Sequence, residues 1–200
     1  MKTSDFAKEE QAIAAINGGF FNMDKGGSVT YLEENDSIYQ RNIPHGIKWA
    51  IADWAKTGAV IIQKDGQLQL EAANTETFYK KSKAESSVLI TGPLLIMAGK
   101  KVPQSNTKFV NNRHPRTCIC ETTTDNLLIT VDGRQAKAQG MSILELQDFL
   151  LAQKCLEAIN LDGGGSTTMW LKEKGVVNNP SDIFGERKVA NAILVKVKEL

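Results

Sequence analysis

The chain has 200 residues, of which 42% are hydrophobic and 24% charged, values that are ordinary for one globular domain with a sizeable core. Its 24 Lys and Arg residues balance 23 Asp and Glu residues, so no overall field favours nucleic acid or an anionic membrane as a partner. The most apolar stretch, 88–98, is short and interrupted by Gly92 and Pro93, so no transmembrane segment is predicted.

The first half of the chain is predicted to hold one helical segment and several short strands. The polar residues 5–14 have helical character, and the polar, glycine-containing segment 23–48 is predicted to be mostly loop. Asp65 and Gly66 are typical of a tight hairpin turn between two β-rich segments. The strands predicted in this half are 12–16, 59–63, 67–71 and 88–91.

The second half has stronger patterns. Ser142 and Glu145 match a capping box, and apolar residues recur at helical spacing from Ile143 to Leu150, so a helix is predicted to run to about Cys155. The strands predicted here are 117–122, 127–131, 158–161, 168–171, 176–177 and 189–197. Because strands outnumber helices, we expect an α+β fold: a mixed, mostly antiparallel sheet with a few packing helices in a single domain.

The three cysteines do not form an obvious disulfide framework. Cys118 and Cys120 alternate along a predicted strand and therefore face the same side, whereas Cys155 comes late on the predicted helix. We expect all three to be buried free thiols, and their spacing supports no metal site.

Residues 160–168 read Asn-Leu-Asp-Gly-Gly-Gly-Ser-Thr-Thr and follow a short apolar strand. Three consecutive glycines are costly to order, and a chain tolerates them where the backbone approaches a ligand closely. A strand-to-strand turn without a ligand is the alternative. The loop lacks the lysine of a phosphate-binding P-loop and the following helix of a dinucleotide site. Asp162 with the Ser166 and Thr167 hydroxyls suits a sugar or a phosphoester.

The predicted hairpin 117–131 brings a second group of charged residues together. If Asp125 and Asn126 form its turn, Arg116 and Arg134 lie at the open end as neighbours, with His114 and Asp132 nearby. Paired arginines hold a phosphate or carboxylate in bidentate fashion. The alternative is a surface end in which Asp132 pairs with an arginine. His114 is predicted either as a general acid or base or as a structural residue.

Several segments, taken together and in order, resemble the phosphodiester glycosidase domain family across residues 13–197. They are Asn-Gly-Gly-Phe-Phe at 17–21, Thr-Gly-Pro-Leu-Leu at 91–95, Arg-His-Pro-Arg-Thr at 113–117, Asp-Gly-Arg at 132–134, Gly-Met-Ser at 140–142, the glycine loop at 160–166, Asn-Asn-Pro-Ser-Asp at 178–182 and Gly-Glu-Arg at 185–187.

The resemblance implies hydrolysis of a sugar-1-phosphodiester, of an N-acetylglucosamine-like sugar, carried by a small molecule or a glycan. It implies no cofactor, and a divalent cation held by Asp132 and Asp162 stays an alternative. Family domains carry further strands before the segment matching 17–21, where this chain has about a dozen residues, so residues 1–200 are expected to lack those strands. A secreted or periplasmic bacterial protein is implied, with a cytoplasmic one as the alternative because no apolar leader opens this chain.

The roles expected under this resemblance start from the carboxylates. Asp162 is expected as the nucleophile or water-activating base, Asp132 as the second carboxylate and His114 as a possible proton donor. A phosphate is already a good leaving group, so cations are expected to matter more than acid catalysis. The arginines expected to bind the phosphodiester are Arg113, Arg116, Arg134 and Arg187. The other expected substrate-binding residues are Asn17, Gly18, Asn160, Gly163, Gly164, Ser166, Thr167, Asn178 and Ser181.

Two rivals come from other classes of protein. The domain is alternatively a non-catalytic module that binds carbohydrate or sugar phosphate at the cell envelope. A structural, envelope-associated protein with a vestigial site is the third hypothesis, and internal salt bridges within the Arg and Asp cluster would favour it.

Overall fold

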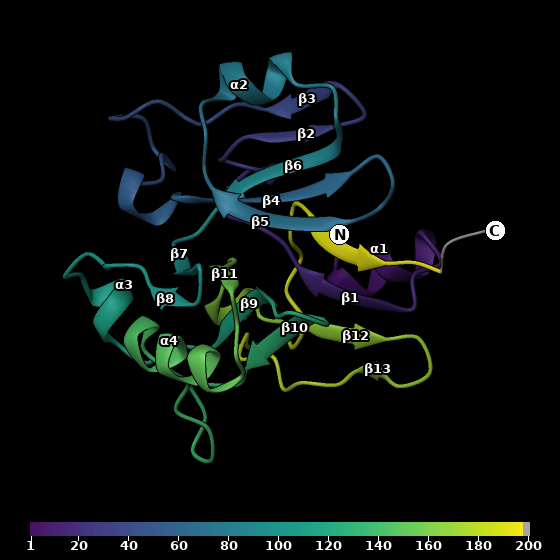
Figure 1. The fold of residues 1–200 in the computed structure, drawn as a ribbon. Coiled ribbons are helices and arrows are strands. Elements are labelled where there is room, and N and C mark those ends of the chain that lie inside the picture. Colours follow the sequence, from purple (N-terminus) through teal and green to yellow (C-terminus); the bar gives the residue numbers. More distant parts are fainter. Residues whose placement is uncertain (198–200) are drawn as a thin grey trace.

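The computed structural model describes residues 1–197, and their strands form three sheets (Figure 1). Two five-stranded sheets pack face to face, and a four-stranded sheet lies at one end. Every strand pair in this described part of the chain is antiparallel, and four short helices accompany the sheets. The α+β fold class predicted from the sequence is confirmed.

The central sheet carries the hairpin that the sequence predicted. Its strands are, in spatial order, β10 (Asn126–Val131), β9 (Arg116–Glu121), β11 (Glu157–Asn160), β7 (Leu94–Met97) and β8 (Lys100–Lys101). The β9–β10 register runs from Arg116 opposite Val131 to Glu121 opposite Asn126, so the turn lies at 122–125, and Asn126, which was expected in the turn, instead begins β10. Helices α3 (Lys108–Asn111) and α4 (Ile143–Ala152) cover the outer face. The Ser142–Glu145 capping box that opens α4 is present.

The outer sheet packs on the other face of the central sheet. Its strands are β3 (Ser37–Gln40), β2 (Leu32–Glu34), β6 (Glu85–Thr91), β4 (Gly58–Gln63) and β5 (Leu68–Ala72). Val60, Leu89 and Ile159 belong to the apolar cluster that joins the two sheets. Helix α2 (Glu76–Lys81) covers the outer sheet from outside (Figure 1), where Tyr79 packs on Tyr31. A short 3₁₀ helix, η1 (Asp53–Ala55), precedes β4.

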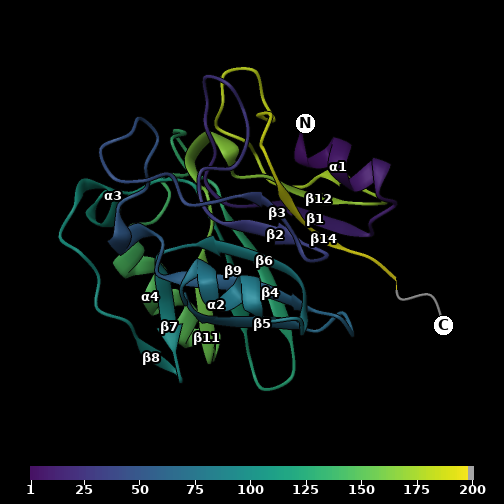
Figure 2. The ribbon, with the colours of Figure 1, turned by 90° about the horizontal axis from the view of Figure 1, so that it is seen from above.

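The terminal sheet brings the two ends of the chain together. Its strands are β13 (Gly175–Val176), β12 (Met169–Leu171), β1 (Ala14–Asn17) and β14 (Ala192–Val195). Helix α1 (Thr3–Glu9) lies against this sheet, and Ala7, Ala15 and Trp170 form its small core (Figure 2). The predicted last strand, 189–197, is thus shortened to its middle four residues.

Segment 23–48 is mostly loop, as predicted, but it also contains two short strands, β2 and β3, that were not predicted. They form an edge hairpin whose turn residues Asn35 and Asp36 have φ of 49° and 62°, a conformation that Asn and Asp tolerate. Glu33 is buried in β2 and accepts a hydrogen bond from the Tyr31 hydroxyl. A buried glutamate in a short strand hides the apolar alternation on which the prediction relied.

The expectation of three free thiols is also wrong. Cys120 and Cys155 form a disulfide with their Cα atoms 5.6 Å apart, and only Cys118 is a buried free thiol. Both cysteines lie in the apolar cluster that α4 covers, Cys120 on β9 and Cys155 on the segment that returns from α4 to β11. The pairing depends on where the chain returns after α4, which spacing does not reveal. As predicted, Cys118 and Cys120 pack into the same apolar cluster.

Candidate active site

The glycine loop, residues 160–168, lies where the central and terminal sheets meet. Its first residues leave β11, the Leu161 N–H donates to the Thr117 carbonyl at 2.8 Å, and the Asp162 N–H donates to the Gly18 carbonyl at 3.0 Å. A 3₁₀ turn, η2 (Gly164–Ser166), then leads into β12. Figure 2 shows this green turn at the end of the molecule where the purple segment after β1 and the yellow segment after β13 also gather.

The three glycines are required by what lies against them. A Cβ atom on Gly163 would come within 2.7 Å of the Pro115 carbonyl oxygen, and one on Gly164, whose φ is +60°, would lie 3.0 Å from the Arg134 guanidinium. A Cβ atom on Gly165 would collide with the Arg187 guanidinium. The loop therefore lies between two arginines that come from different segments. The Pro115 backbone at Gly163 and the positive φ of Gly164 disfavour a side chain at these two positions, whereas at Gly165 the Arg187 side chain would have to move.

Asp162 is the partly buried carboxylate of this loop. Burial raises its pKa to about 6, against the lowering effects of the Ser166 hydroxyl, the Gly163 N–H and the charges of Arg187 and Arg134. The Gly163 N–H donates to Asp162 Oδ1 at 3.0 Å, whereas the Ser166 hydroxyl lies close without completing a hydrogen bond of ordinary geometry. A carboxyl group with a pKa near 6 is ionised at neutral pH yet poorly solvated, which suits a nucleophile or a base.

His114 and Arg134 lie side by side at the loop's edge, with Arg134 Nη2 3.4 Å from His114 Nδ1. Burial and the charges of Arg116 and Arg134 lower the pKa of His114, so its ring is neutral at neutral pH. The Arg134 backbone has φ of 58°, an uncommon conformation for a side chain of this size that occurs often at functional sites.

Arg187 is held by Asp182, a residue that was not predicted to belong to the site. Its Nε lies 2.7 Å from Asp182 Oδ2, and both side chains are mostly buried. The available signal was that the two residues lie five positions apart, in the neighbouring segments 178–182 and 185–187. Asn191 was also missed: its Oδ1 accepts the Gly19 N–H at 2.7 Å beside the close-packed Gly18.

Asp132 is engaged with the segment after β13. Its Oδ1 accepts the Asn179 N–H at 2.9 Å and the Asn178 Nδ2 group at 3.2 Å. Asn178 in turn donates to the Thr167 carbonyl at 3.0 Å and accepts the Met169 N–H at 2.7 Å. Asp132 therefore supports the glycine loop through Asn178.

Four residues predicted to bind substrate make other contacts in the structure. Asn17 and Asn160 are fully buried, and their amide groups donate to backbone carbonyls, at 2.6 Å to Asp162 and 2.9 Å to Gly92 respectively. Arg113 forms an exposed ion pair with Glu145.

Arg116 is the fourth. Its side chain is 1% exposed and donates to the carbonyls of Phe109, Asn112 and Met141 at 2.7 to 3.1 Å. These contacts are structural, so direct substrate binding by Arg116 disagrees with its position. Its charge still reaches the site, since it helps to lower the pKa of His114.

Buried polar atoms without partners gather around the glycine loop. Within residues 1–197, the hydroxyls of Ser166, Thr167 and Thr168 are buried and find no hydrogen-bond partner, and neither do Asn160 Oδ1 and Ser181 Oγ. Such groups are rare in native proteins and each calls for a ligand, a water molecule or a functional role. Of the ten such atoms in the described part of the chain, four belong to the glycine loop, more than any other segment contributes.

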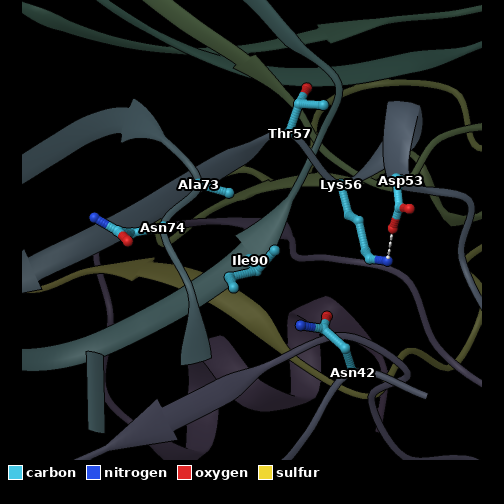
Figure 3. A pocket seen from close by; sticks show the side chains of 7 residues that line it. All are labelled: Asn42, Asp53, Lys56, Thr57, Ala73, Asn74 and Ile90. Carbon is cyan, nitrogen blue, oxygen red and sulfur yellow. Dashed lines mark hydrogen bonds and ion pairs between the residues drawn. The ribbon is translucent and has the colours of Figure 1, made fainter. Parts of the chain in front are cut away.

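A separate hollow of about 400 Å³ opens beside the outer sheet (Figure 3). Its lining includes Lys56, paired with Asp53 at 2.5 Å, and the amides Asn42 and Asn74. It contains none of the predicted site residues. In the described part of the chain, no three His, Cys, Asp or Glu side chains come together as a metal site. None of the helices among residues 1–197 has the length and apolar character needed to cross a membrane.

The sequence model of the phosphodiester glycosidase family matches residues 10–196. The chain belongs to this family. The human N-acetylglucosamine-1-phosphodiester alpha-N-acetylglucosaminidase is 38% identical over 190 residues, which cover 88% of this chain and 35% of that protein. The SPbeta prophage-derived uncharacterized protein YomE of Bacillus subtilis is 25% identical over 201 residues, covering 94% of this chain and 28% of that protein.

Solved structures show the same fold. The catalytic domain of the zebrafish N-acetylglucosamine-1-phosphodiester alpha-N-acetylglucosaminidase, described as auto-inhibited by its pro-peptide, superposes with a TM-score of 0.75 at 21% identity, over 98% of this chain and 67% of that one. A hypothetical protein from Synechocystis superposes with a TM-score of 0.58 at 16% identity, over 96% of this chain and 52% of that one. The chain thus has the family fold but spans only about a third of its curated relatives.

Proposed function

We propose that this phosphodiester glycosidase domain hydrolyses a sugar-1-phosphodiester, with an N-acetylglucosamine-like sugar, to free sugar and a phosphomonoester. The observation that carries the proposal is the glycine loop: Asp162 directly precedes its three glycines, and the guanidinium groups of Arg134 and Arg187 lie against those glycines. A carboxylate for the sugar carbon and two cations for the phosphate are what this reaction needs.

The arginines supply most of the catalytic effect in this proposal. A phosphodiester carries one negative charge, which grows on the phosphate as the bond to the sugar C1 breaks and its electron pair leaves with the oxygen. Arg134 and Arg187 match a phosphate in charge and fork geometry. Because phosphate accepts that charge readily, electrostatic stabilisation takes the place of a strong general acid.

Asp162 acts on the sugar carbon, either by attacking C1 directly or by taking a proton from the attacking water. Its pKa of about 6 keeps it ionised at neutral pH, and its poor solvation keeps it reactive. In the net reaction, water gives a hydroxyl to C1 and a proton to the medium or to the phosphomonoester.

In this proposal His114 donates a hydrogen bond to the phosphate and is not the proton donor expected from the resemblance. Its lowered pKa leaves the ring neutral, and Arg134, which only donates hydrogen bonds, faces Nδ1. The ring proton then resides on Nε2, where it donates a hydrogen bond to a phosphate oxygen. Asp132 positions the loop through Asn178, which donates to the Thr167 carbonyl.

A location outside the cytoplasm fits the same proposal. The Cys120–Cys155 disulfide is of a kind that persists in oxidising compartments and is rare in the cytosol. We expect protein isolated without reductant to take up an alkylating reagent at one cysteine, Cys118, and only after unfolding. Alkylation of three cysteines in mass spectrometry would contradict the disulfide and this location.

The test is release of free sugar from a panel of sugar-1-phosphodiesters that includes UDP-N-acetylglucosamine. Asp162→Asn should lose at least about 1,000-fold in kcat, because it removes the reacting carboxylate. Asp148→Asn is the matched control, since Asp148 is an exposed carboxylate on α4. Equal activity of the wild type and Asp162→Asn would disprove the role of Asp162. Binding without turnover by a folded wild type would favour the binding module.

A further inference from the structure

The most exposed large apolar side chains of residues 1–197 sit on one turn. Ile183 is 89% and Phe184 86% exposed, at the tip of residues 181–187, which we call the 181–187 turn. The Gly185 N–H donates to the Asp182 carbonyl at 2.9 Å, and Gly185 has φ of +78°, so the turn is tight and has a defined backbone conformation. Two neighbouring apolar side chains left in water at a defined turn are typical of a contact surface.

The 181–187 turn is held at both ends. Asp182 pairs with Arg187 across its base at 2.7 Å. On the far side, the Glu186 carboxylate accepts the Ser4 N–H at 2.7 Å and the Ser4 hydroxyl at 2.6 Å, which ties the turn to α1. The apolar tip is therefore presented on a fixed base.

The Asp182–Arg187 pair also connects the 181–187 turn with the candidate active site. Arg187 lies against Gly165 of the glycine loop and contributes to the electrostatic environment of Asp162. In the proposed function the sugar lies at Asp162 and the phosphate at Arg187. Because Arg187 itself belongs to the 181–187 turn, an alcohol esterified to that phosphate lies next to this turn.

We propose that Ile183 and Phe184 bind an apolar alcohol portion of the substrate, so that the preferred diesters join a sugar phosphate to an alkyl or isoprenoid-like chain. This rests on the proposed function for the position of the phosphate. Burial of a Phe or Ile side chain against such a chain contributes enough to change an affinity more than tenfold.

The experiment compares the methyl and hexyl diesters of N-acetylglucosamine-1-phosphate. We expect the wild type to cleave the hexyl ester with a kcat/KM at least about tenfold higher, mainly through KM. The double variant Ile183→Ser/Phe184→Ser should bring the ratio of the two kcat/KM values close to one. Tyr39→Ser, which removes an exposed aromatic side chain on the distant β3, should keep the wild-type ratio.

A parallel binding measurement separates this proposal from the proposed function. Hexyl phosphate and methyl phosphate are titrated into wild type and double variant by calorimetry. A hexyl preference that only the wild type shows supports the alkyl contact even if neither ester is cleaved. An unchanged preference in the double variant, or none in the wild type, overturns it. Loss of phospholipid vesicle binding in the double variant without any change in the ester preference would assign the turn to membrane attachment and also overturn it.

Discussion

Arg116 and Arg134 flank the same end of the β9–β10 hairpin, yet their side chains enter two different regions of the molecule, the interior and the surface beside the glycine loop. Arg116 begins β9, turns inward and donates to carbonyls of Phe109, Asn112 and Met141. Arg134 follows β10, is exposed, and reaches the glycine loop beside His114.

The difference separates residues that hold the fold from residues that face a ligand. Inward residues such as Arg116, Asn17 and Asn160 are surrounded by backbone carbonyls that they bind. Outward residues such as Arg134 and His114 lie at the edge of the glycine loop with side chains that solvent can reach. Changing the first kind should cost stability, and changing the second kind should cost activity.

The largest effect is expected at Arg116. Arg116→Met removes a buried cation and leaves three carbonyls without their donor, so the free energy of unfolding should fall by about 3–5 kcal/mol. Urea unfolding measures it. Arg113→Ala, in the same tetrapeptide, is the control: it breaks only an exposed ion pair and should cost less than about 1 kcal/mol. Similar losses in both variants would show that Arg116 does not hold the fold.

The reverse pattern is expected at Arg134. Arg134→Ala removes a cation from the phosphate position, so kcat/KM for a phosphodiester should fall about 100-fold. Its side chain is exposed, so the free energy of unfolding measured in urea should stay within about 1 kcal/mol of the wild-type value. A variant that unfolds easily but retains its activity would reverse the distinction between the two arginines.

Much of the fold was predictable where local patterns were strong. The 59–71 hairpin, the 117–131 hairpin and the capped helix after Ser142 all formed as predicted, because their turns and caps are specified by adjacent residues. The edge hairpin of β2 and β3 and the Cys120–Cys155 disulfide escaped prediction. Both depend on tertiary packing: burial of Glu33 by Tyr31 and the return of the chain after α4.

The sequence predicted which segments meet at the candidate site, but not which of their side chains point into the protein and which point toward the site. Hairpin pairing brought His114, Arg116 and Arg134 to one end, as expected. Which of these side chains turns inward depends on the carbonyls left free by α3 and by the segment before α4, which no spacing encodes. The same holds for Asp182, whose importance appears only once Arg187 is seen against Gly165.

The smallest expected effect is the change in the free energy of unfolding that follows when the Asp162 carboxylate is removed from the glycine loop. Burial raises the pKa of Asp162 from 3.8 to about 6, so the folded state binds this proton more tightly than the unfolded state. Stability from this group is therefore complete below about pH 4 and is lost as the pH rises through 6. Asp162→Asn should be about 1–3 kcal/mol more stable than the wild type at pH 8, with the difference vanishing near pH 4.

Urea unfolding of wild type and Asp162→Asn at a series of pH values measures the difference. Asp148→Asn, whose carboxylate is exposed, should show no such pH-dependent gain. If Asp162→Asn were instead less stable at pH 8, the Asp162 carboxylate would be a stabilising partner of the arginines, and the loop would belong with the fold-holding residues. A gain at pH 8 that disappears in acid, together with lost turnover, is what a carboxylate held for chemistry should produce.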